Sequence, residues 1–158
     1  LGGHFSYAYA IAEDGRIVGM SYSASDATHR ATLWLNGVPV DLGTPGGTRN
    51  SHATDINGLG HVVGFEDTAT SQTHAFLLTL AANGSVLTRT DLGLLGGGYS
   101  YAYALNGYDE VVGASNGAAF VWQSGVMTDL NTLIASSADW RLDAARTINN
   151  GGQIAGLG

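Results

Sequence analysis

The chain has 158 residues and a net charge of −7, from 13 carboxylates against 6 arginines, with no lysine. Without a cluster of basic side chains to neutralise phosphates, nucleic acid and anionic membrane surfaces are disfavoured as partners. The absence of cysteine excludes disulfides and thiolate metal sites. The longest apolar run, residues 75–82, is far shorter than the roughly 20 residues of a membrane-spanning helix, so no membrane insertion is expected. With 44% hydrophobic residues and 24 glycines against 2 prolines, the sequence predicts a folded chain of short strands and tight turns.

The N-terminal part of the chain predicts four consecutive strands. Strands are expected at residues 6–12, 16–22, 30–35 and 38–42. The first of them alternates tyrosine with alanine, the period-2 pattern of a strand with two different faces. Glu13-Asp14-Gly15 predicts the first turn, and Asn36-Gly37 is a strong hairpin signal for the last one. Four strands in about 45 residues match one blade of a β-propeller or one sheet module.

The same order of segments recurs along the chain. A ten-residue unit, clearest at residues 55–64 (DINGLGHVVG), is repeated at 10–19, 104–113 and 147–156, and its closing glycines are 45, 49 and 43 residues apart. A second block recurs at residues 30–34, 74–78 and 118–122, and it is followed each time by Asp-Leu-Gly or Asp-Leu-Asn. The sequence therefore predicts an all-β, propeller-like array of four-stranded antiparallel blades. It comprises about three and a half repeats of 43–49 residues, at approximately 1–45, 46–95, 96–134 and, as a partial copy, 135–158.

The connections between repeats are predicted from their glycines. Gly46-Gly47 and Gly96-Gly97-Gly98 are expected to be crossings between modules, because no lysine or helix start follows them as a phosphate loop would need. Residues 130–142 depart from this connection and predict a capping type of terminal repeat, of which only the first hairpin is present.

The recurring pattern D-L-G … G-G … I-N-x-x-G-x-V-V-G … H-A-F-L-W resembles the extracellular HAF repeat family over essentially the whole chain. The family is named for a His-Ala-Phe triplet, which stands here as His74-Ala75-Phe76. The other copies have Arg30-Ala31-Thr32 and Ala118-Ala119-Phe120, and this loss of the histidine argues against a role as ligand or catalyst. The resemblance implies a secreted bacterial protein with a β-propeller fold, in some members followed by a C-terminal cell-surface sorting segment, and it implies no established activity.

The turns and the histidines are the candidates for metal binding. The Asn/Asp/Gly turns carry at most two carboxylates each, whereas a calcium site needs several converging oxygens, and these residue types also suit plain tight hairpins. The histidines, at positions 4, 29, 52, 61 and 74, include no short-spaced pair of the kind zinc sites use. No Gly-x-Ser-x-Gly elbow is present. No metal, cofactor or catalytic residue is therefore predicted.

The candidate binding residues are the tyrosines of the first strands and the histidine aligned with them. Tyr7, Tyr9, Tyr101 and Tyr103 alternate with alanines, and His52 takes the place of Tyr7 and Tyr101 in the second copy. Either the rings pack between blades with their hydroxyls at the rim, or they line a channel mouth that binds a saccharide or a peptide. The acidic chain favours a neutral or cationic ligand.

The expected function is that of a secreted or cell-surface β-propeller-type repeat module with a non-catalytic binding or structural role. Two alternatives stay open: a polysaccharide-acting enzyme with a channel-mouth site near Tyr7, His52 and Tyr101, and a self-assembling extracellular structural protein. Carboxylates and histidines clustered at one mouth would favour the enzyme. An unpaired, uncharged strand at an open end would favour self-assembly.

Two further expectations concern packing and completeness. Trp34 and Trp122 end apolar strands at the same point of the repeat and are predicted to be deeply buried between neighbouring sheets. Closed propellers usually have 4–8 blades, so three and a half repeats should not close a ring. Missing N-terminal repeats or a second copy of the chain would complete it.

Overall fold

The computed structural model describes residues 1–44, 49–135 and 140–158, and over these residues it confirms the all-β class. Every sheet is antiparallel, each strand pairing with the next along the chain, and the sheets are numbered 1 to 4 in chain order. Sheet 1 comprises β1 (Gly2–Ile11), β2 (Ile17–Ser23), β3 (His29–Leu35) and β4 (Val38–Asp41). Sheet 2 comprises β5 (Ser51–Ile56), β6 (His61–Asp67), β7 (Thr73–Leu80) and β8 (Val86–Gly93). Sheet 3 comprises β9 (Ser100–Leu105), β10 (Val111–Ser115), β11 (Ala118–Gln123) and β12 (Val126–Asp129), and sheet 4 comprises β13 (Ala144–Ile148) and β14 (Ile154–Leu157).

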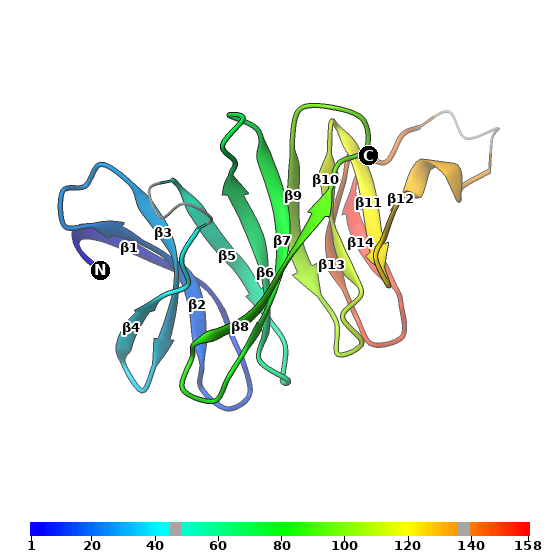
Figure 1. Cartoon of the computed structure of the whole chain (residues 1–158). Coiled ribbons are helices and arrows are strands. Elements are labelled where there is room, and N and C mark those ends of the chain that lie inside the picture. Colours follow the sequence, from blue (N-terminus) through cyan, green and yellow to red (C-terminus); the bar gives the residue numbers. More distant parts are fainter. Residues whose placement is uncertain (45–48, 136–139) are drawn as a thin grey trace.

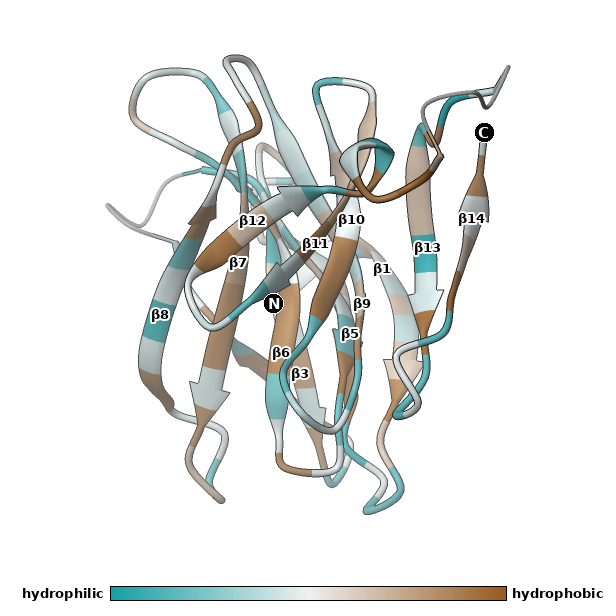
Figure 2. Cartoon of the chain, turned by 90° about the vertical axis from the view of Figure 1, so that its right-hand side faces the viewer, coloured by the Kyte–Doolittle hydropathy of each residue, from teal (hydrophilic) through white to brown (hydrophobic). Residues whose placement is uncertain are grey.

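The four sheets stand side by side in chain order, with sheet 1 and sheet 4 at the two ends of the row (Figure 1). One apolar cluster fills each space between neighbouring sheets, three clusters among the described residues. Seen from the C-terminal end, the two-stranded sheet 4 lies beside the four-stranded sheet 3 (Figure 2). The described residues form an open row of sheets, not a closed ring.

The hairpin turns follow the sequence signals. The hairpin predicted at Asn36-Gly37 is present, and both residues have positive φ, 52° and 80°, as a type I′ turn requires. Asn116-Gly117 and Ser124-Gly125 adopt the same pair of left-handed conformations in sheet 3. β1 is longer than predicted and begins at Gly2, because an irregularity between Gly2 and Ser6 lets the additional residues pair with β2.

Each first strand carries a bulge opposite the closing glycine of the ten-residue unit. The bulged residues, which interrupt the register of these strands, are Tyr9, Thr54, Tyr103 and Arg146. A Cβ on Gly64 would lie 1.9 Å from the carbonyl oxygen of His52, and one on Gly113 would lie 1.9 Å from that of Tyr101. No side chain fits so close to the neighbouring backbone, which explains why glycine recurs at this position.

Equivalent residues of successive repeats point toward the preceding sheet. Ile56, Leu105 and Ile148 end the first strands of sheets 2, 3 and 4, and each belongs to the cluster shared with the sheet before it. Ile11 is their counterpart in sheet 1 and is 67% exposed. Sheet 1 therefore presents outward a face that the later sheets bury.

The two repeat tryptophans differ for the same reason. Trp122 is buried in the cluster between sheets 2 and 3, as predicted. For Trp34 the prediction of deep burial was wrong, because this side chain is only partly buried. Trp34 pairs with Ile17 across β2 and β3, whereas the neighbouring pair of Val18 and Leu33 packs in the cluster with sheet 2. Trp34 thus lies on the outer face of sheet 1.

Recurring polar side chains join neighbouring sheets. Ser51 Oγ accepts a hydrogen bond from the backbone N–H of Ala31 at 2.8 Å, and Ser100 Oγ accepts one from that of Ala75 at 2.9 Å. Both serines are fully buried at the start of a first strand. Each satisfies a backbone donor of the preceding sheet that would otherwise be buried without a partner.

The turn asparagines link the opposite end of the sheets. Asn57 Nδ2 donates to the carbonyl of Asn106 at 3.1 Å, and Asn106 Nδ2 donates to that of Asn149 at 3.2 Å. The side-chain oxygens of these residues accept backbone N–H groups of their own turns. The Asn-rich turns therefore serve both the hairpin and the contact between repeats, which agrees with their interpretation as turn residues.

The HAF-type triplet and the Asp-Leu-Gly marker are structurally connected. Nδ1 of His74 lies 2.7 Å from Oδ2 of Asp91, whose other oxygen accepts the backbone N–H of Gly93. In sheet 1, Arg30 takes the place of the histidine and pairs with Asp41 at 3.4 Å. In sheets 1 and 2 a basic residue in the third strand thus holds the aspartate of the fourth, whereas sheet 3 has Ala118 at this position.

The connections between sheets agree with the sequence where they are described. Gly96-Gly97-Gly98 joins sheet 2 to sheet 3, and Gly96 and Gly98 have φ of 86° and 106°. Gly46-Gly47 lies outside the described residues. After sheet 3, a short 3₁₀ helix, η1 (Leu130–Thr132), departs from the earlier connections. Asn131 then holds Leu142 through two hydrogen bonds of 2.7 and 2.9 Å, and this anchors the entry to sheet 4.

Candidate functional site

Aromatic rings form a continuous surface across sheets 1, 2 and 3, mostly on their first and second strands. We call this surface the aromatic wall, and its members are Phe5, Tyr9, Tyr22, His29, His52, Phe65, Tyr99, Tyr101 and Tyr103. Each ring contacts at least one other, with centroids 4.5 to 6.4 Å apart. These separations are typical of stacked and edge-to-face aromatic pairs.

His52 is the centre of the aromatic wall. Its ring stacks on Phe65 at 4.6 Å and meets the edge of His29 at 4.5 Å. Tyr9 of sheet 1 stacks on the same imidazole at 6.2 Å. Phe65 in turn contacts Tyr101 of sheet 3 at 4.8 Å, edge to face. A single chain of rings therefore connects three sheets.

At its sheet 3 end, the aromatic wall contacts the guanidinium group of Arg146 from sheet 4. Tyr101 stacks on Tyr103 at 6.4 Å, and the guanidinium carbon of Arg146 lies 4.2 Å from the centroid of the Tyr103 ring, a cation–π contact. Tyr9, Tyr103 and Arg146 are all bulged residues of their strands. The irregularity repeated in each first strand thus supplies three of the side chains found here.

Burial favours the neutral form of three rings of the aromatic wall, those of His52, Tyr9 and Tyr103. The pKa of His52 is lowered to about 4, first because its ring is buried and second because His29 is close, while Asp67 acts in the opposite direction. Burial also raises the pKa of Tyr9 and that of Tyr103. His52 is therefore a neutral imidazole, and both phenols keep their protons and can donate hydrogen bonds.

The structure brings together four of the five predicted site residues. Tyr9, His52, Tyr101 and Tyr103 belong to the aromatic wall. Tyr7 lies on β1, where its ring is 52% exposed and makes no ring contact with another described residue, although its phenol contributes to the raised pKa of Tyr9. Whether any of these residues binds a ligand remains a prediction.

Sequence reasoning did not find the rest of the aromatic wall. The members it missed are Phe5, Tyr22, His29, Phe65 and Tyr99, together with Arg146 at the end. Tyr99 could have been found, because it precedes Tyr101 by two residues and therefore shares its face. Phe65 lies directly opposite His52, and that pairing depends on the register of β5 and β6, which includes a bulge.

The remaining histidines have separate carboxylate partners. Nδ1 of His61 lies 2.7 Å from Oδ1 of Asp109, His74 pairs with Asp91, and His4 pairs with Asp26. The hydrogen bond that the His4 ring donates to the Asp26 carboxylate raises the pKa of His4. Within the described ranges, no three histidine, cysteine, aspartate or glutamate side chains come together as a metal site would require.

Comparison of the chain with family models, with curated proteins and with solved structures gives no match in any of the three. In the part of the chain that the structure describes, no helix has both the length and the apolar character needed to cross a bilayer.

Proposed function

We propose that this chain is a non-catalytic, saccharide-binding repeat module of a secreted or cell-surface β-propeller. The observation that supports binding is the aromatic wall, a row of rings that crosses three sheets and remains partly open to solvent. Tyr9 is 49% exposed and Tyr99 38% exposed, so their faces are accessible to a ligand. Aromatic faces pack well against the apolar C–H faces of sugar rings, while phenol hydroxyls can hydrogen-bond sugar hydroxyls.

A row of rings suits an extended saccharide better than a compact ligand. His52, Phe65 and Tyr101 follow one another with centroid separations of 4.6 and 4.8 Å, so successive sugar units could contact successive rings. A peptide with aromatic or proline side chains could also stack here. Peptide binding is therefore an outcome that the experiment must distinguish.

The enzyme alternative has less support. Hydrolysis of a glycoside by the common mechanisms uses two carboxyl groups that flank the scissile bond. The aromatic wall brings His29 and His52 together, but none of its members is a carboxylate. Asp67, which influences the pKa of His52, is already held by Asn50 at 3.2 Å and by Thr73 at 3.2 Å.

We also infer that the row of sheets is part of a propeller ring. The first strands of neighbouring sheets lie together: Thr54 Oγ1 donates to the carbonyl of Ala102 at 2.9 Å, and Leu105 N–H donates to Asp55 at 3.0 Å. Such contacts suit first strands that gather around a common axis. The outer face of sheet 1 is also apolar. It presents Ile11 and Trp34, whose counterparts in sheet 3 are buried against sheet 2. In this proposal, another repeat or a second copy of the chain covers that face.

Binding can be tested on a glycan array that also carries peptides. The wild-type chain is compared with the triple variant Tyr9→Ala, His52→Ala, Tyr101→Ala and with the control Tyr108→Ala, whose ring is 73% exposed in a turn outside the aromatic wall. The proposal expects glycan binding by the wild type and by the control, with loss in the triple variant. Equal glycan binding by all three proteins, or selective binding of peptides, would contradict it.

Whether the outer face of sheet 1 needs a covering partner can be tested by native mass spectrometry of the 158-residue chain. Exposed apolar sheet faces favour association, so dimers or larger species are expected for the wild type. The double variant Ile11→Ser, Trp34→Ser should shift the population toward monomer. A wild-type monomer with a cooperative melt would show that these repeats do not need a partner.

A further inference from the structure

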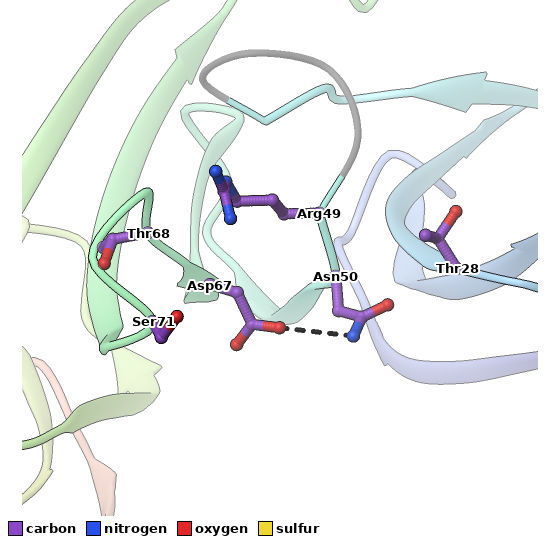
Figure 3. A pocket seen from close by; sticks show the side chains of 6 residues that line it. All are labelled: Thr28, Arg49, Asn50, Asp67, Thr68 and Ser71. Atoms are coloured by element: carbon purple, nitrogen blue, oxygen red, sulfur yellow. Dashed lines mark hydrogen bonds between the residues drawn. The ribbon is translucent and has the colours of Figure 1, made fainter.

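A polar pocket of about 340 Å³ lies between sheets 1 and 2. It is lined by Thr28, Arg49, Asn50, Asp67, Thr68 and Ser71, which Figure 3 shows from close by. The pocket adjoins the aromatic wall through His29. The backbone N–H of His29 donates to Asn50 Oδ1 at 3.2 Å, while its ring contacts His52. A ligand on the wall could therefore extend into this pocket.

One part of the pocket is held rigidly. Asn50 Nδ2 donates to Asp67 Oδ2 at 3.2 Å (Figure 3), and the backbone N–H of Asp67 donates to the carbonyl of Asn50 at 3.0 Å. Thr73 Oγ1 donates to the other carboxylate oxygen at 3.2 Å. These bonds fix an acceptor, the Asp67 carboxylate, in a preorganised position.

The other part of the pocket has unused hydrogen-bonding groups. Arg49 forms no hydrogen bond or ion pair with any other described residue, and the hydroxyls of Thr28 and Ser71 form none either. In Figure 3 the Arg49 side chain extends over Asp67 toward Thr68, yet Arg49 and Asp67 do not form an ion pair. The pocket lining thus includes both a cationic donor without a partner among the described residues and a fixed anionic acceptor.

This arrangement is not a general feature of the repeat. Asn116 occupies the position of Asp67 in sheet 3, and there its amide donates to the carbonyl of Leu95 at 2.7 Å while its oxygen accepts the N–H of Tyr99. The loop that contributes Thr68 and Ser71 is also longer than the Asn116-Gly117 turn of sheet 3. Residues that only hold the repeats together recur, so a feature confined to one junction is a candidate for binding.

We propose that this pocket is the subsite for one uncharged sugar unit, which is held through a pair of neighbouring hydroxyls. This inference rests on the proposed function. Adjoining units of the same saccharide stack on the aromatic wall. Arg49 donates a hydrogen bond to one hydroxyl oxygen, and Asp67 accepts a hydrogen bond from the neighbouring hydroxyl. The free hydroxyls of Thr28 and Ser71 supply further contacts.

The preference for an uncharged sugar unit follows from the hydrogen-bonding groups of the pocket. Every sugar hydroxyl is both donor and acceptor, so a diol satisfies Arg49 and Asp67 at once. A carboxylate offers only acceptors and would be repelled by Asp67, whereas an ammonium offers only donors and would be repelled by Arg49. A uronate or an amino sugar is therefore disfavoured in this subsite relative to a neutral unit.

The test uses a panel of methyl glycosides of neutral hexoses, with the methyl glycosides of glucuronic acid and glucosamine as charged probes. Binding to the full chain is followed by NMR titration.

The pocket variants are Arg49→Met and Asp67→Asn, and the wall variant is Tyr9→Ala with Tyr101→Ala. The matched control is Arg141→Met, whose side chain is 60% exposed in the segment before sheet 4. Because charged hydrogen bonds are lost, each pocket variant should bind a neutral glycoside about tenfold more weakly. The wall variant and the control should bind it as the wild type does.

A neutral oligosaccharide found on the array separates the two proposals. If its binding is lost in the wall variant but unchanged in both pocket variants, the subsite is wrong and the proposed function stands. If the pocket variants lose the neutral glycoside while the wall variant keeps full affinity for the oligosaccharide, the subsite stands and binding by the wall is wrong. Tighter binding of the glucuronide or the glucosaminide than of every neutral glycoside would overturn the uncharged class.

Discussion

Sheets 1 and 3 are built from the same repeat and differ in what covers them. In sheet 3, Leu105 and Trp122 are buried against sheet 2, while in sheet 1 their counterparts Ile11 and Trp34 lie on an outer face. The strand order, the bulge and the hairpin are the same in both sheets. Burial at these positions is therefore decided by the neighbouring sheet. Side chains at equivalent positions of the repeat consequently contribute differently to the stability of the fold.

The largest effect is expected for the tryptophan pair. Trp122→Ala should lower the free energy of unfolding by about 3–5 kcal/mol, because it removes a large buried side chain and leaves a cavity. Trp34→Ala should cost less than half as much, since its ring is already partly solvated. Denaturant unfolding at low protein concentration, where association is weak, measures both values. Equal losses would mean that something covers the outer face of sheet 1 in solution.

The residues that end the first strands give the next largest difference in the loss of stability. Leu105→Ala should cost about 2–5 kcal/mol, as is typical of a buried leucine. Ile11→Ala should stay within about 0.5 kcal/mol, the range of ordinary surface substitutions. Thermal unfolding followed by circular dichroism, with the wild type scanned in parallel, checks the pair. A large loss for Ile11→Ala would contradict the exposure of this face.

The serines at the start of the first strands test the polar contact between sheets. Ser100 Oγ accepts from Ala75 N–H at 2.9 Å and donates to the carbonyl of Gly93 at 2.7 Å, so Ser100→Ala should cost about 1–3 kcal/mol by leaving buried groups unpaired. Ser6 begins the corresponding stretch of sheet 1 and is exposed, so Ser6→Ala should change little. Hydrogen exchange of the Ala75 amide gives a direct readout, and unchanged protection in Ser100→Ala would refute the role of the serine.

The last comparison concerns pH and His52, which stands in sheet 2 where sheet 3 has Tyr101. The unfolded chain takes up a proton at His52 near pH 6.5, whereas the folded chain does so only near pH 4. Between these values the unfolded state binds more protons, so stability falls as the pH is lowered. His52→Tyr makes this position like Tyr101 of sheet 3 and should reduce the loss. Unfolding curves of both proteins from pH 7 to pH 4 provide the measurement, and parallel pH profiles would show that His52 is not shielded.

Much of the candidate site needed the register of the sheets. The alternation of Tyr101 and Tyr103 indicated a shared face, and the alignment of His52 with Tyr101 indicated a common position. Neither pattern showed that Phe65 lies between His52 and Tyr101, because this contact joins two hairpins and depends on a bulge. The pocket beside the wall was also not predictable, since Arg49 and Thr28 come from different repeats.

Local information determined the architecture of a single repeat. Tyrosine–alanine alternation, Asn-Gly turns and a recurring glycine were sufficient to predict strands, hairpins and an all-β fold, because each acts through backbone conformation and the two faces of a strand. Tertiary structure alone decided which equivalent residues are buried and which aromatic rings touch. Those outcomes depend on the neighbour of each sheet, so Trp34 and Trp122 have the same place in the repeat and different surroundings.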